Sequence, residues 1–210
     1  MKIGVLALQG DFAEHQVMLK GLGVEAVQVR LAQQLEGLSG FIIPGGESTT
    51  IGKLAEDFQL IEPLRRFGAD HAIWGTCAGA IFLSKDIHRR QPLLQLMDIT
   101  VERNAFGRQI DSFETNLDVP CLDFEDGDHN GGYNGEGAGT PDGLRYVRPF
   151  HAVFIRAPLI EAVHGDTQVL SRLPDGRIVA AQEGHWLATS FHPELTGDDR
   201  FHRYFLELSK

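Results

Sequence analysis

Cysteine and long apolar runs are scarce in this sequence. Its 210 residues include two cysteines, Cys77 and Cys121, which are too few for a disulfide framework or a cysteine-based zinc site. No apolar run approaches the roughly 18 residues of a membrane span, and the apolar start at 3–8 is too short for a secretory signal. We therefore expect a cytoplasmic protein with no membrane association.

Basic residues are missing from one long stretch. No Lys or Arg lies between Gln109 and Leu144, where nine Asp and Glu residues occur. Outside this stretch 20 acids face 19 bases, so the net charge of −10 belongs almost entirely to it. Neither part carries the basic patch that nucleic-acid binding requires, and we expect no nucleic-acid partner. We expect one domain over 1–210, with an acidic, glycine-rich surface insertion at about 118–143.

The order of apolar and helical patterns predicts the fold class. In the first half, short apolar segments alternate with helical ones, which indicates a mostly parallel sheet covered by helices on both faces. In the second half the apolar segments follow one another closely, which indicates antiparallel additions. Asp11 is a candidate N-cap of the first helix. The predicted strands lie at 3–8, 24–29, 40–43, 72–74, 99–102, 153–155, 168–173, 178–182 and 187–191, and the predicted helices at 12–22, 48–57, 61–68 and 198–208.

The segment around Cys77 has the pattern of a nucleophile elbow with cysteine in place of serine. Gly75 and Gly79 flank Cys77 between a short apolar strand and an apolar helix, and such glycines allow a tight turn. The start of the helix directs N–H groups at the sulfur and stabilises negative charge on it. A buried structural cysteine is the alternative. Cys121 lacks glycine flanks and lies among acids, so it is the weaker candidate nucleophile.

A cysteine nucleophile needs a base, and His192 is the best-placed histidine. It follows the apolar run 187–191 and precedes Pro193 and Glu194. Pro193 favours an extended His192, and in extended backbone residues i and i+2 project to the same side. Glu194 can therefore orient the imidazole. A solvated histidine at a strand end is the alternative. The other histidines have no partner in the sequence, and we assign most of them to the surface or to packing.

The turn after the predicted strand 40–43 is a candidate oxyanion hole. Gly45 and Gly46 follow this strand at the sheet edge where Cys77 is expected. Backbone N–H groups of this glycine pair and of Ala78 can face an oxyanion there. Without the elbow, the same glycines would be read only as a turn.

Together these motifs resemble those of the class I, triad-type glutamine amidotransferases. The closer resemblance is to the glutaminase subunits of pyridoxal 5′-phosphate synthase. That family has a much shorter connection where this chain has 118–143. The segments that carry the resemblance span almost the whole chain: GVLALQG at 4–10, PGGESTT at 44–50, RNAFGRQ at 103–109, FIRAP at 154–158 and HPE at 192–194.

The resemblance implies a flavodoxin-like three-layer α/β sandwich that hydrolyses L-glutamine to glutamate and ammonia. In such an enzyme Cys77 forms a glutamyl thioester, His192 transfers protons and Glu194 orients His192. The backbone N–H groups of Gly46 and Ala78 stabilise the oxyanion.

The resemblance also implies the binding residues and the partner. A cationic Arg103 suits the α-carboxylate of glutamine. The ammonia passes to a barrel-shaped lyase subunit that makes pyridoxal 5′-phosphate within a hetero-oligomer, and this chain itself uses no metal and no cofactor. The glutamine-binding residues implied are Gly46, Glu47, Ser48, Arg103, Ile155 and Arg156.

Three other functions remain open at this point. The chain could serve another synthase, such as imidazole glycerol phosphate synthase, although the segment 103–109 argues against that. It could be a non-catalytic binding module on the same fold, against which the intact Cys, His and Glu argue. It could also be a cysteine hydrolase of other γ-glutamyl amides, which competition with glutamine would distinguish.

Overall fold

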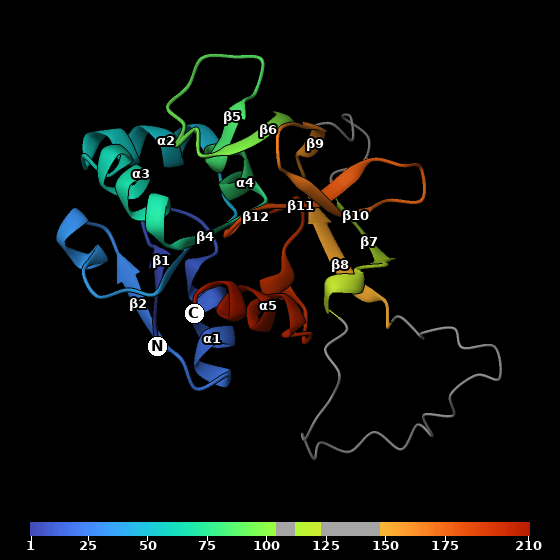
Figure 1. Ribbon diagram of the computed structural model, residues 1–210, viewed down its shortest axis with the longest axis horizontal. Helices are drawn as coiled ribbons and strands as arrows, with labels where there is room; N and C mark the ends of the chain where they lie inside the picture. The colour runs from blue at the N-terminus through green and yellow to red at the C-terminus, as the bar shows by residue number, and fades with distance from the viewer. Residues whose placement is uncertain (104–111, 123–147) are drawn as a thin grey trace.

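Strands from both halves of the chain build the main sheet. The computed structural model describes residues 1–103, 112–122 and 148–210. The strands are β1 (Lys2–Leu6), β2 (Glu25–Val29), β3 (Gly40–Ile43), β4 (Ala72–Thr76), β5 (Ser84–Asp86), β6 (Met97–Glu102), β7 (Ser112–Leu117), β8 (Phe150–Ile155), β9 (Leu159–Val163), β10 (Gln168–Arg172), β11 (Ile178–Glu183) and β12 (Trp186–Thr189). Within the described residues the main sheet has ten strands in the order β2-β1-β3-β4-β12-β11-β9-β6-β5, with β10 paired to β11, while β7 and β8 form a separate sheet (Figure 1).

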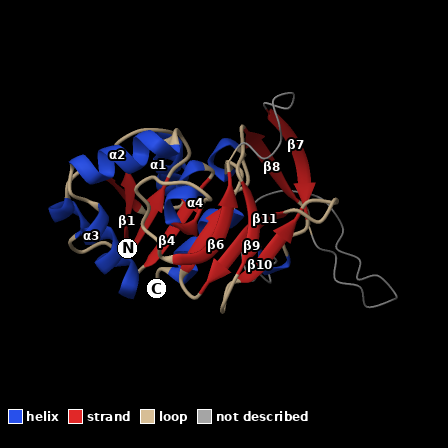
Figure 2. Cartoon of the chain, turned by 90° about the horizontal axis from the view of Figure 1, so that it is seen from above, coloured by secondary structure: helices blue, strands red, loops and turns tan. Residues whose placement is uncertain are grey.

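Helices cover both faces of the parallel part of this sheet. The α-helices are α1 (Phe12–Gly21), α2 (Ser48–Asp57), α3 (Ile61–Asp70), α4 (Ala78–Leu83) and α5 (Arg200–Leu208), and the 3₁₀ helices are η1 (Ala32–Leu35), η2 (Pro120–Leu122) and η3 (Pro193–Leu195). The helices α2, α3 and α4 pack on one face, and α1 and α5 on the other (Figure 1). Figure 2 shows β7 and β8 at the end of the molecule away from β1. In the ranges given above, no helix has both the length and the apolar character that crossing a membrane requires.

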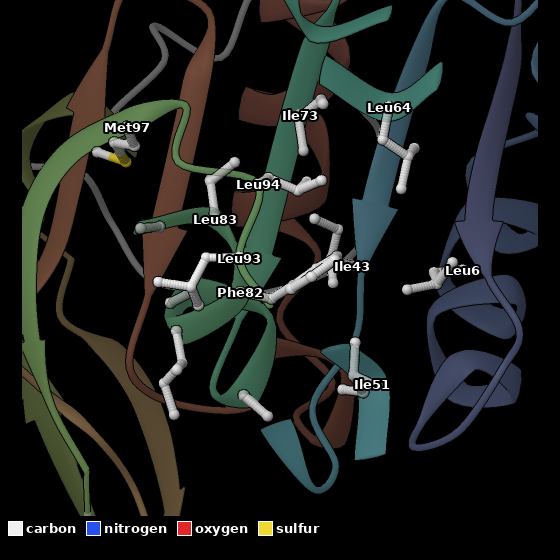
Figure 3. Close-up of a cluster of buried hydrophobic side chains, with 14 of the residues drawn as sticks. Leu6, Ile43, Ile51, Leu64, Ile73, Phe82, Leu83, Leu93, Leu94 and Met97 are labelled. Atoms are coloured by element: carbon white, nitrogen blue, oxygen red, sulfur yellow. The ribbon is translucent and has the colours of Figure 1, made fainter. Parts of the chain in front are cut away.

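The central parallel strands are apolar because both of their faces are covered. β3 and β4 are buried along their whole length, as expected of strands between two helical layers. Successive side chains alternate between the layers. Trp74 packs with Phe201 and Phe205 of α5 on one face, and fully burying each of these phenylalanines contributes about 1.5–3 kcal/mol. Figure 3 shows the cluster on the other face, which includes Leu6, Ile43, Ile51, Leu64, Ile73, Phe82, Leu83, Leu93, Leu94 and Met97.

The strand β12 joins the parallel and antiparallel halves. It pairs in parallel with β4, from Trp186 opposite Ile73 to Thr189 opposite Thr76, and antiparallel with β11. The pairs β11–β9, β9–β6 and β10–β11 are also antiparallel. Because β4 and β12 run in the same direction and end opposite each other, the residues that follow them meet at one edge of the sheet.

The predicted fold class is confirmed, and three strands were not predicted. The sheet is mixed, with its parallel part between two helical layers and its antiparallel additions in the second half, as expected. β5 has three residues, of which two are exposed, so it carries no apolar pattern. β7 alternates exposed and covered residues, but it lies in the acidic stretch that obscured its period of two. β9 has one buried residue and an exposed Glu161 at its centre, so its apolar pattern is weak.

The expected surface insertion at 118–143 starts too early. Val119 and Leu122 are buried in the cluster that contains Trp74, and Ser171 Oγ donates a hydrogen bond to the carbonyl oxygen of Asp118. Residues 118–122 therefore belong to the packed part of the protein, because η2 turns two apolar side chains inward. The remainder of the range, from 123 onward, lies outside the described residues.

Candidate active site

Cys77 occupies a strained turn between β4 and α4. Its backbone has φ 48° and ψ −108°, a left-handed conformation that costs a residue with a side chain on the order of 1–3 kcal/mol. The N–H of Cys77 donates a 2.8 Å hydrogen bond to the carbonyl oxygen of Thr189 at the end of β12. The thiol is buried, and its Sγ lies 3.9 Å from the carbonyl oxygen of Ile155. The turn thus points the sulfur at the strand ends of β8 and β12.

Two glycines let α4 approach the sheet closely enough to form this turn. A Cβ on Gly79 would overlap the carbonyl oxygen of Ile43 in β3, and a Cβ on Gly75 would lie 2.5 Å from the carbonyl carbon of Gly79. Neither overlap can be relieved by moving a side chain alone, because backbone atoms meet. The Gly-x-Cys-x-Gly pattern is therefore a packing requirement of the elbow.

His192 and Glu194 meet as predicted, but through a different backbone. His192 Nδ1 lies 2.7 Å from Glu194 Oε1, and both side chains are buried. The backbone is not extended across the pair: His192 has ψ 84°, and Pro193 opens the 3₁₀ helix η3. The N–H of His192 donates to the carbonyl oxygen of Val153 at 2.9 Å, which ties the turn to β8. A 3₁₀ turn after β12, and not strand alternation, therefore brings the carboxylate to the imidazole.

The electrostatics of the triad favour a charged imidazole. Burial lowers the pKa of His192, but hydrogen bonds with Cys77 and Glu194 and the charges of both outweigh burial and raise this pKa to about 10. Burial raises the pKa of Glu194, which the hydrogen bond and the charge of His192 oppose. Because Nδ1 faces Glu194, the other ring nitrogen of His192 is the one available to Cys77. The arrangement can supply a nucleophilic sulfur and an imidazolium that donates a proton.

Asp11 is a second acid beside His192. We expected this residue to cap α1, but its side chain makes no capping hydrogen bond, and its Oδ2 lies 3.5 Å from His192 Nδ1. Among the described residues, Asp11, His192 and Glu194 form the one group whose ligand atoms are close enough to hold a metal ion. The 2.7 Å distance between His192 Nδ1 and Glu194 Oε1 is that of a hydrogen bond. A metal would displace that proton, so we interpret the group as the acid side of a triad.

The glycine turn after β3 lies against the triad. A Cβ on Gly45 would overlap Cε1 of His192 and lie 2.9 Å from its Nδ1. Gly46 has φ 149°, and a Cβ there would overlap Oε1 of Gln9. The same Oε1 accepts a 2.8 Å hydrogen bond from the N–H of Glu47. Ala78 begins α4 directly after Cys77, where helix N–H groups have no partner within the helix. The structure thus brings both expected oxyanion donors to the site, Gly46 beside the turn that touches His192 and Ala78 beside Cys77.

Glu47 and Arg103, both expected to bind glutamine, contact each other. Arg103 Nη2 donates to Glu47 Oε1 at 3.0 Å, and Arg103 Nη1 donates to Thr49 Oγ1 at 3.0 Å. Glu47 also caps α2, accepting hydrogen bonds from the N–H groups of Thr49 and Thr50. Burial raises the pKa of Glu47, but these hydrogen bonds outweigh it and lower the pKa to about 2. Ser48 is buried beside this pair.

The last two expected binding residues follow β8. Ile155 presents its carbonyl oxygen to the thiol of Cys77 and keeps its side chain 40% exposed. Arg156 is exposed and has φ 45°, so the chain turns sharply there. Of the two residues, Ile155 contacts the sulfur and Arg156 follows it in the chain. The segment 104–109, which carried part of the resemblance, lies outside the described residues.

Sequence reasoning missed four residues around the triad. Gln9 and Asp11 follow β1 and reach the glycine turn and His192. His15 and His202 are fully buried, which agrees with packing residues, but the sequence did not predict that they contact each other or that His15 lies beside Glu194. One signal was available, because His15 stands four residues before the buried Leu19 on the same face of α1. No sequence pattern pairs His15 with His202, since they belong to different helices.

The chain resembles one family of known proteins over nearly its full length. It matches the model of the SNO glutamine amidotransferase family over residues 5–210. It is 55% identical over 213 residues to the pyridoxal 5′-phosphate synthase subunit PdxT of Herpetosiphon aurantiacus, covering 99% of this chain and 100% of the relative. It is 49% identical to the protein of the same name in Chloroflexus aurantiacus, again covering 99% and 100%.

Solved structures show the same likeness. A crystal structure of a glutamine amidotransferase superposes with a TM-score of 0.82 at 47% identity, covering 99% of this chain and 98% of the other. The structure of PurLQS from Thermotoga maritima superposes with a TM-score of 0.65 at 14% identity, covering 100% and 98%. At that identity the second likeness concerns the fold alone.

Proposed function

The chain belongs to the SNO glutamine amidotransferase family, and from this membership and the geometry around Cys77 we propose that Cys77, His192 and Glu194 hydrolyse the side-chain amide of L-glutamine. One observation carries the assignment of roles. The cysteine at the strand-to-helix turn is close enough to His192 to raise the pKa of the imidazole, and His192 Nδ1 lies 2.7 Å from an oxygen of the buried Glu194 carboxylate. That order of nucleophile, base and orienting acid is the order that covalent amide hydrolysis needs.

The enzyme is a glutaminase that serves pyridoxal 5′-phosphate synthesis. Its relatives in Herpetosiphon aurantiacus and Chloroflexus aurantiacus are named as subunits of pyridoxal 5′-phosphate synthase. Their identity to this chain is about one half over almost the whole length of both proteins. L-glutamine is thus converted to L-glutamate and ammonia, and the ammonia supplies the nitrogen that vitamin B6 biosynthesis consumes.

The proposed reaction has two halves. The thiol proton of Cys77 passes to His192, the thiolate Sγ attacks the carbonyl carbon of the amide, and the carbonyl oxygen becomes an oxyanion. The imidazolium of His192 gives its proton to the amide nitrogen, the C–N bond breaks, and ammonia leaves a glutamyl thioester on Cys77. Neutral His192 then takes a proton from water while the water oxygen attacks the thioester, and collapse of this intermediate releases glutamate.

The other residues of the proposed site stabilise the charges that develop on His192 and on the substrate oxygen. Glu194 accepts the Nδ1–H of His192 and so orients the ring and stabilises its positive charge. The backbone N–H groups of Gly46 and Ala78 stabilise the oxyanion, and losing one such donor costs about 10²–10³ in kcat. The contact between the glycine turn and the His192 ring supports this placement.

We further propose that glutamine is held between the β3–α2 turn and the end of β8. The binding residues are Gly46, Glu47, Ser48, Arg103, Ile155 and Arg156. The pairing of Arg103 with Glu47 supports this assignment, because the two side chains present opposite charges to one region. The α-carboxylate of glutamine can take the place of Glu47 on Arg103, and its α-ammonium group complements the Glu47 carboxylate.

The partner is a lyase subunit of barrel fold, with which this chain forms a hetero-oligomer in the cytoplasm. The names of the relatives support a multi-subunit synthase, and the rest of this statement comes from the resemblance of the sequence.

An electrophilic glutamine analogue tests the nucleophile directly. We expect mass spectrometry to find the adduct on Cys77 and not on Cys121, and we expect Cys77→Ala to lose glutamate production in the presence of the synthase partner. Cys121→Ser is the matched control and should retain turnover. An adduct on Cys121, or hydrolysis by Cys77→Ala near the wild-type rate, would overturn the assignment.

A further inference from the structure

A fully buried histidine stands behind the triad acid. His15 lies in α1, and its Nε2 is 3.4 Å from Glu194 Oε2 and 3.2 Å from Thr76 Oγ1. Both side chains of the His15–Glu194 pair have no exposed surface. Glu194 Oε1 is bound to His192, whereas among the described residues Oε2 has no hydrogen-bond partner. His15 Nε2, whose hydrogen bond is with Thr76 Oγ1, is the ring nitrogen that approaches this second carboxylate oxygen.

A second buried histidine fixes the direction of the donors. His15 Nδ1 lies 3.0 Å from His202 Nε2 in α5, and His202 Nδ1 is buried without a partner in the described part of the chain. A buried N–H donor without an acceptor is costlier and rarer than an acceptor without a donor. Nδ1 of His202 is therefore the unprotonated ring nitrogen. Nε2 of His202 carries the proton and donates it in the hydrogen bond to His15 Nδ1. His15 in turn carries its proton on Nε2, where Glu194 and Thr76 lie.

The surroundings keep both imidazoles neutral. Burial, with the charges of His202 and His192, lowers the pKa of His15 well below its usual value. Burial lowers the pKa of His202 to about 4, which Asp199 opposes. The groups that face the His15 ring are Glu194 and His192 from the η3 segment, His202 from α5, and Thr76 and the edge-on ring of Trp74 from β4. Only Glu194 among them carries negative charge, and it is already paired with His192.

We propose that His15 is a positioning residue of the triad, a neutral N–H group whose positive end, 3.4 Å from the second oxygen of Glu194, stabilises the carboxylate so that the first oxygen stays on His192. The proposal rests on the proposed glutaminase function. A neutral donor suits this place better than a cation, because a charged His15 would compete with the imidazolium of His192 for the same carboxylate. His202 acts one step further away by orienting His15.

Two substitutions of His15 separate a donor from a space-filling side chain. His15→Leu removes the donor, whereas His15→Gln places an amide N–H near the position of Nε2. Hydrogen-bond partners of metal-ligating residues typically contribute about 10- to 100-fold, and by analogy we expect His15→Leu to lower kcat by a similar factor with little change in KM. We expect His15→Gln to recover most of the loss.

The pH profile distinguishes positioning from packing. Without a donor to Oε2 the Glu194 carboxylate is less stabilised, so in His15→Leu the acidic limb of kcat/KM should move to higher pH. Gln16→Leu is the matched control. Gln16 is buried in the same helix, and its side chain bonds the Ala26 carbonyl and Gln28, away from the triad. The Gln16→Leu variant should have a lower melting temperature but the same acidic limb of kcat/KM as the wild type.

A measurement on the wild-type protein keeps the proposal testable even where His15→Leu does not fold. Nitrogen-15 NMR of labelled histidines should show His15 neutral with its proton on Nε2 at pH 7, since burial lowers the pKa of His15 well below its usual value. A charged His15 at pH 7 would overturn the proposal, as would a folded His15→Leu enzyme with wild-type kcat and pH profile. If the wild-type protein with its synthase partner releases no glutamate, the proposed function itself has failed, which is a different result.

Discussion

Asp11 Oδ2 lies 3.5 Å from His192 Nδ1, the same ring nitrogen that Glu194 Oε1 approaches to 2.7 Å. The two acids differ in their surroundings. Glu194 is buried, whereas the side chain of Asp11 is 40% exposed. The proposed base, His192, therefore has one acid in the core and a weaker, solvated one at the surface, which predicts that the two acids are energetically coupled.

The first prediction concerns this coupling. Glu194→Gln should lower kcat less than Cys77→Ala does, because Asp11 can still attract the Nδ1–H of His192. Asp11→Asn alone should have a small effect. The double variant should lose more than the sum of the single losses, by a coupling free energy of about 0.5–3 kcal/mol for side chains in contact. Steady-state kinetics of the four proteins in a double-mutant cycle measure it, and strictly additive losses would show that Asp11 does not act on His192.

The second prediction concerns Gly45. A Cβ at this position would overlap Cε1 of His192 and lie 3.0 Å from Asp11 Oδ2. Gly45→Ala should therefore displace the imidazole and lower kcat by roughly 10²-fold, the loss expected when a catalytic group moves by about 1 Å. Gly21→Ala is the control, because a Cβ there meets nothing within 4 Å. Equal kcat in the two variants, with both folded by circular dichroism, would contradict this view of the glycine turn.

The third prediction concerns pH. The pKa of His192 is raised from 6.5 to about 10, so protonated His192 favours the folded state. This stabilisation is complete below about pH 6.5 and is lost as the pH rises through about 10. The free energy of unfolding in urea should therefore fall between about pH 7 and 10 more steeply for the wild type than for His192→Asn. NMR titration of Cys77→Ala should show a lower pKa for His192, since one of its hydrogen bonds is gone. The same slope in wild type and His192→Asn would refute the shift.

The fourth prediction concerns the N-cap of α2. Glu47→Gln keeps the shape of the side chain but removes the charge that Thr49, Thr50 and Arg103 contact. The Gln amide keeps one acceptor oxygen, so one of the two capping hydrogen bonds is lost, which costs about 0.5–1.5 kcal/mol. Because the pKa of Glu47 is lowered from 4.5 to about 2, the difference from wild type should be full above about pH 4.5 and vanish as the pH falls through about 2. Glu56→Gln, an exposed acid at the other end of the helix, should change the unfolding free energy little at any pH.

The sequence predicts those parts of the fold whose structure is determined by residues close together in the chain. β3 and β4 are apolar throughout because they are covered on both sides, and the elbow glycines are fixed by backbone contact within a few residues of Cys77. His192 and Glu194 are two residues apart, so their pairing is also local, although a 3₁₀ turn and not an extended strand produces it.

The parts that the sequence does not predict depend on the meeting of distant segments. Arg103 reaches Glu47 only because β6 ends near the start of α2. His15 reaches Glu194 because α1 packs against η3, and the Asp11 side chain is drawn from its expected capping position to His192. β7 and the buried residues Val119 and Leu122 lie within or beside the acidic stretch, where composition outweighed the weak alternation of apolar residues.

The position of β12 has a consequence for the synthesis of this protein. β12 fills the middle of the sheet between β4 and β11, yet it is the last of the described strands to leave the ribosome. Until then the emerging chain carries an unpaired edge at β4, and such edges pair readily with other chains. The hydrogen bond from the Cys77 N–H to the Thr189 carbonyl oxygen also cannot form until β12 has been synthesised. A messenger truncated before the codon for Trp186 should thus yield an aggregating product with no partial activity, and the cell gains no glutaminase from unfinished copies.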